Sequence, residues 1–389
     1  MRKLIYFVVF CALVSCNSKS RTGKSDDGLV RIDMEGGYPK KEIILQDIAE
    51  VEYIPLETRT DVLLAATALE QICMSDSLIV ARSNSSVFIF DRRGRYVRSF
   101  DHSGRSGEEY ALFGKLAVDF DRQEIYIHDN SGYKICVYDF DGLFRRALKL
   151  PKWSVSQMLN YDRKYLLGCC KESSVNPDST SGKADRPYWL IDKESGEISA
   201  LALAFQERIL SSAIIREPDA MVYMVWPLNS IVKNGEEFLI ADFGSDTIYN
   251  LSGTTFTPYM LKEPSHTWKK TPPVMGWVEF KTNRYTGIKF MELSWEKNTL
   301  VRRILYDRIT GEKVEYDFMN QDFRPARKTF ISLGESEFDL PSGYLKFKLS
   351  ATELRNAYEM GKLDGKLKEI AATLDEDANP VLMLVKFRE

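Results

Sequence analysis

The sequence predicts an all-β fold, a six-bladed β-propeller with a short helical insert near its C-terminus. Three observations predict this fold: a turn that recurs about every 50 residues, short strand-like runs between the turns, and one helical pattern close to the end of the chain. The chain has 389 residues, of which 44% are hydrophobic and 28% are charged, and this composition is that of a globular protein.

The N-terminus has the pattern of an export signal. Arg2 and Lys3 precede an apolar run over 4–14, which is shorter than the roughly 20 residues that a membrane-spanning helix needs. The tetrad Leu-Val-Ser-Cys at 13–16 resembles a lipobox, in which the thiol of Cys16 is acylated. Ordinary cleavage beside an incidental cysteine is the alternative.

These features define the expected domain organisation. We expect a signal peptide over 1–16 that ends at the lipidated Cys16, a flexible tether and lead-in over 17–40, and a propeller domain over 41–389. The protein is then expected in the cell envelope, attached to a membrane through its lipid anchor. The outer membrane is favoured, and the periplasmic or surface face is left open.

The recurring turn begins with an Asp and reaches a Gly three or four positions later. An Asp side chain can hydrogen-bond the backbone of a turn, and Gly accepts a positive φ, so each copy predicts the tight hairpin between the outer two strands of a blade. Four copies pair Asp91 with Gly94, Asp139 with Gly142, Asp192 with Gly196 and Asp307 with Gly311, and a degenerate fifth pairs Asn250 with Gly253.

Short runs of β-branched and aromatic residues lie between these turns, at 78–81, 87–90 and 96–100, and again at 124–127 and 134–138. Side chains that alternate at a period of two let each sheet pack both faces against its neighbours, which is the radial stacking of a propeller. A β-sandwich or a β-barrel is the alternative that these runs leave open.

One stretch, 264–277, is Pro-rich, aromatic and basic where a blade would be compact, and it is typical of a loop over one propeller face. His266 and Trp268 can stack on or hydrogen-bond a sugar or a peptide, because a flat ring offers apolar area with few torsions to restrict. Trp226 and Tyr285 are candidate contributors from neighbouring units. The alternative is that these rings pack between the blades.

The end of the chain predicts a helical insert near 350–375. Ser350 and Glu353 have the spacing of a capping box. Four apolar residues would share one helical face: Leu363, Leu367, Ile370 and Leu374. A final strand over 381–387 is expected to complete a blade that the N-terminal chain begins, which removes an open sheet edge.

Motifs for catalysis and for cofactors are mostly missing. The three histidines have no second His at metal-ligand spacing, and the chain contains no G-x-S-x-G motif and no phosphate-binding loop. We therefore assign no catalytic residue, no metal ligand and no cofactor. The net charge of −3, without a basic stripe, also argues against a nucleic-acid partner.

Two residue types need a separate interpretation. A dense set of aspartates is a weak indication of calcium, but turn formation is the favoured interpretation: Asp119, Asp121, Asp129, Asp139 and Asp141. Four cysteines of the mature chain show no paired spacing and are expected to be mostly buried thiols outside any disulfide: Cys73, Cys136, Cys169 and Cys170.

Several segments are similar to six-bladed β-propeller lipoproteins of Bacteroides-type bacteria, which resemble NHL-repeat and TolB-like propellers. The segments are VEYIPLET at 51–58, GRSGEEY at 104–110, ADFG at 241–244 and DANPVLM at 377–383, and the similarity covers nearly the whole mature chain. The family often has Gly-Pro-Gly before Glu-Tyr, where this chain has Ser106, Gly107 and Glu108. The resemblance implies the fold far more than a function.

Two classes of function follow. The favoured one is a membrane-anchored, extracytoplasmic binding module whose loops at one end of the channel hold a glycan, a peptide or an envelope protein. The alternative is a hydrolase or lyase whose acidic residues gather at the channel, with or without a divalent ion. An aromatic or basic loop surface favours binding, and a cluster of acids on the channel axis favours catalysis.

Overall fold

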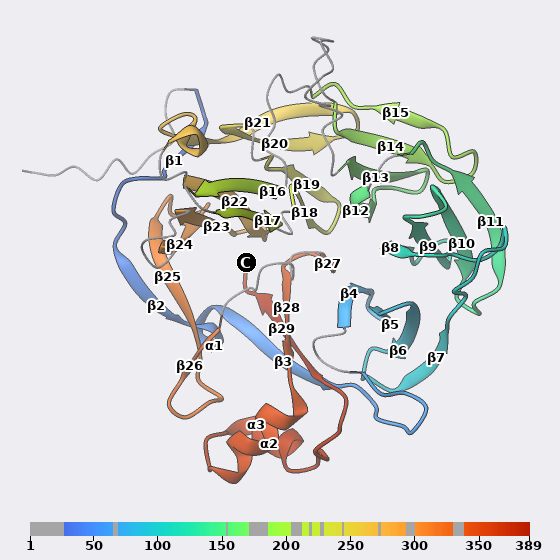
Figure 1. Ribbon diagram of the computed structural model, residues 1–389. Helices are drawn as coiled ribbons and strands as arrows, with labels where there is room; N and C mark the ends of the chain where they lie inside the picture. The colour runs from blue at the N-terminus through green and yellow to red at the C-terminus, as the bar shows by residue number, and fades with distance from the viewer. Residues whose placement is uncertain are drawn as a thin grey trace, which may run out of the picture.

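A computed structural model shows the arrangement of the chain (Figure 1). It describes residues 27–389 except 65–68, 153–154, 171–185, 204–211, 218–219, 226–228, 243–244, 271–273, 293–299 and 330–337. Six sheets stand around a central axis, so the predicted six-bladed β-propeller is confirmed. We number them blades 1 to 6 in the order in which the chain forms their innermost strands.

Each of the first three blades contains an antiparallel four-stranded meander that is continuous in sequence, and blade 1 has a fifth, parallel strand from near the end of the chain. Blade 1 contains β4 (Leu69–Met74), β5 (Leu78–Ser83), β6 (Ser86–Asp91) and β7 (Tyr96–Phe100). Blade 2 contains β8 (Phe113–Asp119), β9 (Glu124–Asp129), β10 (Lys134–Asp139) and β11 (Phe144–Lys149). Blade 3 contains β12 (Val155–Asn160), β13 (Tyr165–Cys170), β14 (Tyr188–Asp192) and β15 (Ile198–Ala200).

The other three blades each take a strand from the N-terminal chain. Blade 4 contains β18 (Ile231–Asn234), β19 (Glu237–Ile240), β20 (Thr247–Ser252) and β21 (Thr255–Glu263), with β1 (Val30–Asp33) at its outer edge. Blade 5 contains β22 (Val274–Lys281), β23 (Tyr285–Glu292), β24 (Leu300–Asp307) and β25 (Lys313–Asn320), with β2 (Lys40–Ile44) and β26 (Arg327–Thr329) beside β25. Blade 6 contains β28 (Tyr344–Leu349), β29 (Val381–Phe387) and β3 (Ala49–Pro55), and β3 follows the short helix α1 (Leu45–Ile48).

The last strand closes the ring as the sequence predicts. Strand β29 has the predicted bounds, and it pairs antiparallel with β3 from Val381 opposite Pro55 to Phe387 opposite Ala49. Strand β27 (Phe338–Asp339) pairs in parallel with β4, the innermost strand of blade 1. The N-terminal chain therefore holds the two ends of the ring together, and β27 carries residues toward the channel.

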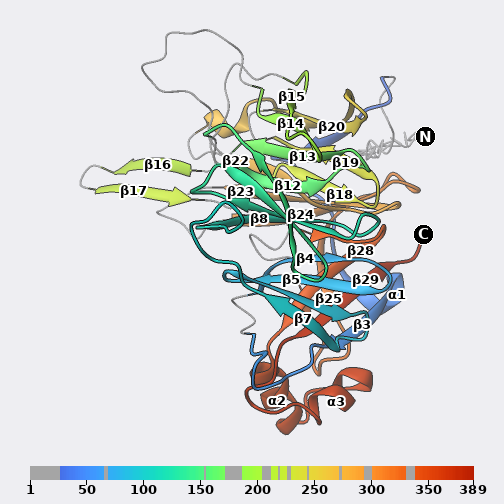
Figure 2. The ribbon, with the colours of Figure 1, turned by 90° about the vertical axis from the view of Figure 1, so that its right-hand side faces the viewer.

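Two segments project from the ring. The hairpin of β16 (Ser212–Glu217) and β17 (Ala220–Val225), between blades 3 and 4, pairs only with itself, and Figure 2 shows it on the side opposite the C-terminus. The insert between β28 and β29 forms α2 (Ala351–Glu359) and α3 (Gly365–Ala371), which lie at the rim beside blades 5 and 6.

The helical insert differs in detail from the prediction. The four predicted apolar residues are buried, but the insert forms two short helices because Gly361 and Gly365 adopt φ angles of 65° and 53° and interrupt the helical backbone. Ser350 occupies the N-cap position of α2, yet its side chain makes no capping hydrogen bond. The predicted capping box is therefore not formed.

The recurring turns have the predicted geometry. Their five glycines all have positive φ, between 58° and 84°. In each Asp turn the carboxylate accepts backbone N–H groups, for example from Arg93 at 2.8 Å in the turn that begins with Asp91. The same contact joins Asp307 to the N–H of Ile309 at 2.9 Å. Apolar side chains between neighbouring blades form the core, and Cys73, Cys136 and Cys169 are buried in it.

Candidate functional site

Of the predicted ligand-binding side chains, the structure describes those of His266 and Tyr285, and it does not bring these two together. His266 is exposed in the loop between blades 4 and 5, just before the short helix η1 (Thr267–Lys269). Its backbone N–H donates to the carboxylate of Asp246 at 3.0 Å. Tyr285 is 6% exposed at the start of β23, with its ring centroid 5.6 Å from that of Phe387. Strand β22, which has 8 residues and spans roughly 25 Å, separates the two positions.

The remaining predicted residues cannot be placed. Cys16, Trp226 and the side chain of Trp268 lie outside the described part of the structure. Tyr285 lines a separate cavity of about 380 Å³ beside β2 and α1. The roles assigned to these residues and to His266 therefore stay predictions.

A larger cavity, of about 700 Å³, lies at the other end of β22, on the face of the propeller that carries the C-terminus. Its walls come from turns of four blades: Asp121 follows β8, Arg163 lies between β12 and β13, Glu236 between β18 and β19, and Arg308 between β24 and β25. We call this cavity the channel groove, because Lys233 in its wall contacts Asp339 of the axial strand β27.

The inner wall of the groove is held by a buried lysine. Lys193 is fully buried in the turn between β14 and β15, and its ammonium donates to Asp119 at 2.5 Å, to Asn160 at 2.6 Å and to the carbonyl of Asp162. Burial removes water from this ammonium and lowers the pKa of Lys193, although Asp119 opposes the shift. The contacts tie blade 3 to blade 2 beside the channel.

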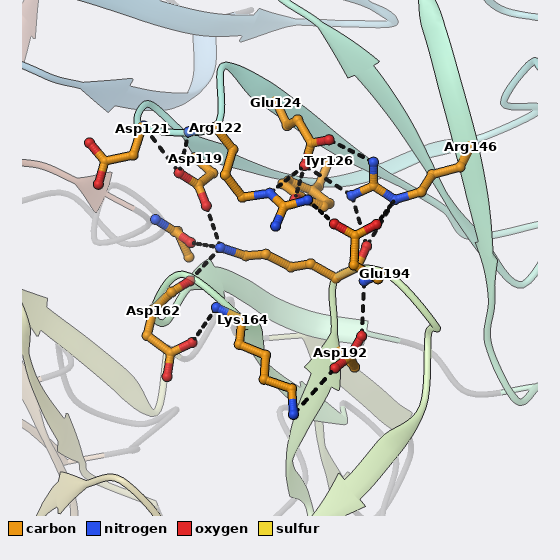
Figure 3. Close-up of polar contacts among 12 residues, drawn as sticks. Asp119, Asp121, Arg122, Glu124, Tyr126, Arg146, Asp162, Lys164, Asp192 and Glu194 are labelled. Carbon is orange, nitrogen blue, oxygen red and sulfur yellow. Dashed lines mark hydrogen bonds and ion pairs between the residues drawn. The ribbon is translucent and has the colours of Figure 1, made fainter.

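A second ionic cluster stands behind this wall. Arg146 binds both carboxylate oxygens of Glu124, at 2.6 and 2.9 Å (Figure 3). Burial alone raises the pKa of Glu124, but hydrogen bonds from Arg146, Tyr126 and Arg122 outweigh burial and lower it to about 2. Arg122 also contacts Glu194 of blade 3. These carboxylates are engaged in the structure, so they form a rigid support for the groove.

Two further ion pairs include residues that line the groove. Lys233 contacts Asp339, and burial raises the pKa of that carboxyl. Lys281 donates to Glu237 at 2.7 Å, and its ammonium lies 5.6 Å from the ring centroid of Tyr259. Burial raises the pKa of Glu237, and the contact with Lys281 more than offsets this and lowers it.

Four charged residues of the groove stay uncommitted. Within the described residues, the side chains of Arg163, Arg308, Asp121 and Glu236 make no hydrogen bond and no ion pair, and all four are exposed to solvent. The cavity therefore offers two arginines and two carboxylates to a ligand. Aromatic rings stand among them, with Tyr161 4.8 Å from Phe238 between ring centroids.

Three of the five aspartates that raised the possibility of calcium act in turns: Asp119, Asp129 and Asp139. Asp119 accepts the N–H groups of Asp121 at 3.1 Å and Arg122 at 3.0 Å, and Asp129 accepts that of Ser131 at 3.1 Å. In the described ranges, no group of three or more His, Cys, Asp or Glu side chains is arranged to hold a metal ion. Turn formation, the favoured interpretation, is thus observed for these three residues.

Sequence reasoning missed the cations of the groove and of its inner wall, although a signal was present. In three copies of the recurring turn a basic residue directly follows the Asp: Arg92, Lys193 and Arg308. All three backbone N–H groups donate to a carbonyl in the first turn of the same blade, at 2.9, 2.9 and 2.8 Å respectively. The repeat therefore places a cation at an equivalent position in blades 1, 3 and 5.

Comparison with known proteins supports the fold and the family. A family model described as "Domain of unknown function (DUF4934)" matches residues 29–386. The chain is similar to a structure from Bacteroides fragilis NCTC 9343, named as a candidate exported protein, with a TM-score of 0.63 and 17% identity over 93% of this chain and 100% of that one. A duf4221 family member from Bacteroides vulgatus ATCC 8482 gives a TM-score of 0.49 and 9% identity, over 88% of this chain and 97% of its own.

Two searches gave a negative result. No curated protein matches the sequence significantly. In the part of the chain that the structure describes, none of the helices has both the length and the apolar character needed to cross a membrane.

Proposed function

The chain belongs to the DUF4934 family of domains of unknown function, and from that premise we propose that it is a lipid-anchored, extracytoplasmic propeller that binds a ligand in the channel groove without transforming it. One observation carries the proposal: the groove leaves two arginines uncommitted, whereas three carboxylates in and around it, two of them buried, are already paired with lysines. The pairs are Asp119 with Lys193, Asp339 with Lys233, and Glu237 with Lys281.

The pairing favours binding over catalysis. A general base must accept a proton from the substrate, and a buried carboxylate that is hydrogen-bonded to an ammonium is a poor acceptor. Breaking such a pair also costs several kcal/mol because it leaves a charge unpaired away from water. The ion pairs therefore act as scaffolding, and the exposed residues on the rim and walls of the groove are left to contact a ligand.

The location follows from the N-terminal pattern. An apolar run over 4–14 followed by the tetrad that ends in Cys16 supports export and lipid attachment. The similar Bacteroides fragilis protein is named as a candidate exported protein, which agrees with this location. Cys16→Ala is expected to release the protein from membranes and to abolish labelling with a radioactive fatty acid. A variant that still sediments with membranes, beside a wild type that takes up no label, contradicts the lipid anchor.

The binding proposal is tested by blocking the groove. Ser252 is an exposed lining residue, so Ser252→Trp fills part of the cavity, whereas Thr254→Trp adds the same ring two residues away at a position that does not line the groove. Both variants are screened beside the wild type against envelope glycans and peptides. We expect Ser252→Trp alone to lose binding of the ligand that the wild type selects. Retention of that binding places the site elsewhere, with the loop over 264–277 as the next candidate.

The hydrolase or lyase alternative depends on Asp121 and Glu236, because their carboxylates line the groove and make no hydrogen bond and no ion pair among the described residues. The same glycans are incubated with the protein and their products separated by size. Cleavage by the wild type that disappears in Asp121→Asn or Glu236→Gln establishes catalysis and overturns the proposal. Unchanged glycans after prolonged incubation support a binding module.

A further inference from the structure

We propose that Arg308 binds the anionic group of an acidic sugar in the channel groove. This inference rests on the proposed function, and it names the class of ligand that the groove takes. It is carried by three observations: the equivalent cations of the other blades, the pairing of the nearby carboxylate, and the character of the groove lining.

The two equivalent cations each have a carboxylate partner on the preceding blade of the ring. Arg92 of blade 1 binds Glu52 of blade 6 at 2.7 Å, and Lys193 of blade 3 binds Asp119 of blade 2 at 2.5 Å. Arg308 has the same place in the repeat and the same backbone hydrogen bond, yet its side chain makes no ion pair within the described residues. The propeller thus repeats a position for a cation, and among the described residues the copy in blade 5 forms no ion pair of its own.

A carboxylate of the preceding blade on which Arg308 acts electrostatically is already occupied. Glu237, in the blade that precedes Arg308, accepts a hydrogen bond at 2.7 Å from Lys281, whose side chain is 6% exposed. One carboxylate thus faces two cations, Lys281 and Arg308, at the blade 5 end of the groove. Among these three side chains the positive charges outnumber the negative one, and an oxyanion is the group that neutralises the difference. A guanidinium suits this role because it can donate two parallel hydrogen bonds to an oxyanion.

The rest of the groove suits the body of a sugar. Asn160, Asn250 and Ser252 supply amide and hydroxyl groups, and Asp121 and Glu236 supply acceptors for sugar hydroxyls. Tyr161, Phe238 and Tyr259 supply aromatic surface, whereas Leu251 is the single aliphatic side chain of the lining that the structure describes. A peptide ligand generally requires apolar pockets for its side chains, so a carbohydrate fits the lining better.

The acidic group can be a carboxylate or a sulfate, since both present two oxygens that can accept parallel hydrogen bonds from one guanidinium. The test therefore uses three probes of similar size: a galacturonate oligomer, a sulfated galactose oligomer and a neutral galactose oligomer. Calorimetric titration compares the wild type with Arg308→Gln. The matched control is Arg93→Gln, which removes an exposed arginine from the equivalent turn of blade 1, far from the groove lining.

We expect the wild type to bind at least one acidic oligomer about 10-fold or more tighter than the neutral one, and Arg308→Gln to remove most of this difference while Arg93→Gln preserves it. An acidic oligomer that binds the wild type and Arg308→Gln equally well overturns the inference. A wild type that prefers the neutral oligomer overturns it as well.

The groove-filling variant separates this inference from the proposed function. When Ser252→Trp abolishes binding but Arg308→Gln leaves it unchanged, the groove is the binding site and the role of Arg308 is wrong. When Ser252→Trp leaves binding unchanged, the groove itself is not the site and both proposals fail. Circular dichroism and melting of each variant verify that the propeller is intact.

Discussion

His128 shows how one buried residue shapes the response of the fold to pH. The residue is fully buried in β9, and neither ring nitrogen has a hydrogen-bond partner in the part of the chain that the structure describes. Burial lowers the pKa of His128 to about 4, against about 6.5 for an unperturbed histidine. Between these two values the unfolded chain binds a proton that the folded chain does not. The free energy of unfolding therefore falls as pH decreases through this window.

The first prediction is that His128→Leu flattens this pH dependence. A shift of this size corresponds to a loss of about 2 kcal/mol in the free energy of unfolding between pH 7.5 and pH 5, and the variant should lose most of that difference. Urea unfolding at the two pH values measures it. His266→Gln is the control, because His266 is exposed. Equal pH slopes in His128→Leu and the wild type contradict the prediction.

The second prediction concerns Lys193, which neutralises Asp119 in a site closed to water. Lys193→Met leaves the carboxylate of Asp119 buried without its counter-charge, and this should lower the free energy of unfolding by about 3 to 5 kcal/mol. Lys164→Met removes an exposed cation that lies 3.8 Å from Asp192 in the same blade, and it should cost less than about 1 kcal/mol. Urea unfolding at pH 7.5 compares the two variants. Similar losses would show that the buried pair has no special role.

At the scale of elements, the turns of the repeat differ in how closely the backbone is packed. A Cβ atom on Gly94 would lie 2.2 Å from the carbonyl oxygen of Pro55, whereas a Cβ on Gly311 would meet no atom within 4 Å. Both glycines have positive φ, of 84° and 75°. The two turns share one sequence pattern, but only the turn of blade 1 packs against the N-terminal strand of the neighbouring blade.

The third prediction follows from this difference. Gly311→Ala should cost about 1 kcal/mol, because the left-handed backbone is strained with a side chain. Gly94→Ala should cost clearly more, because the clash with the Pro55 carbonyl adds to the same strain. Thermal melting of the two variants measures the difference. A Gly311→Ala variant less stable than Gly94→Ala would contradict it.

The fourth prediction concerns Trp268 in the short helix η1, which lies before β22, at the end of that strand away from the groove. Trp268→Ala should weaken binding of a ligand held by the loop over 264–277 by about 1 kcal/mol while it leaves the melting temperature nearly unchanged. A core tryptophan would instead cost about 3 to 5 kcal/mol of stability on truncation. Melting and binding measured on the same preparation separate the two roles. Unchanged affinity for a confirmed ligand excludes the indole of Trp268 from the site.

Local signals explain which elements could be predicted. The Asp-to-Gly turns and the strand over 381–387 depend on neighbouring residues, and the structure has them where they were expected. The helical insert near 350–375 is confirmed, but its division into two helices could not be read from the apolar spacing, which ignores the two glycines between and at the start of the helices. The groove was missed because its walls come from turns of four blades, and spacing along the chain does not reveal which turns meet across a channel. The position of Arg308 directly after a turn Asp is a local signal in the sequence. Its interpretation as a ligand-binding residue requires the ion pairs that Arg92 and Lys193 form at the equivalent positions, and these are seen only in the structure.

At the scale of the whole molecule, stability comes from the apolar layers between blades. Cys73, Cys136 and Cys169 lie in β4, β10 and β13, which belong to three different blades. The fifth prediction is that the melting temperature changes little when a reductant is added, because a domain of this size does not depend on disulfides. Scanning calorimetry with and without dithiothreitol measures the change. A drop of many degrees, with two new thiols on titration, would contradict it.

The three strands of the N-terminal chain have a mechanical consequence. Strand β1 runs parallel to β21, from Val30 opposite Met260 to Asp33 opposite Glu263, and β2 and β3 continue into blades 5 and 6. A force that pulls the N-terminal end of β1 along the strand axis loads the hydrogen bonds between β1 and β21 together, in shear. A force across the strand would instead break these bonds one at a time. A protein held at the proposed lipid anchor at Cys16 therefore has three strand pairings in succession, in blades 4, 5 and 6, between the anchor and the rest of the propeller.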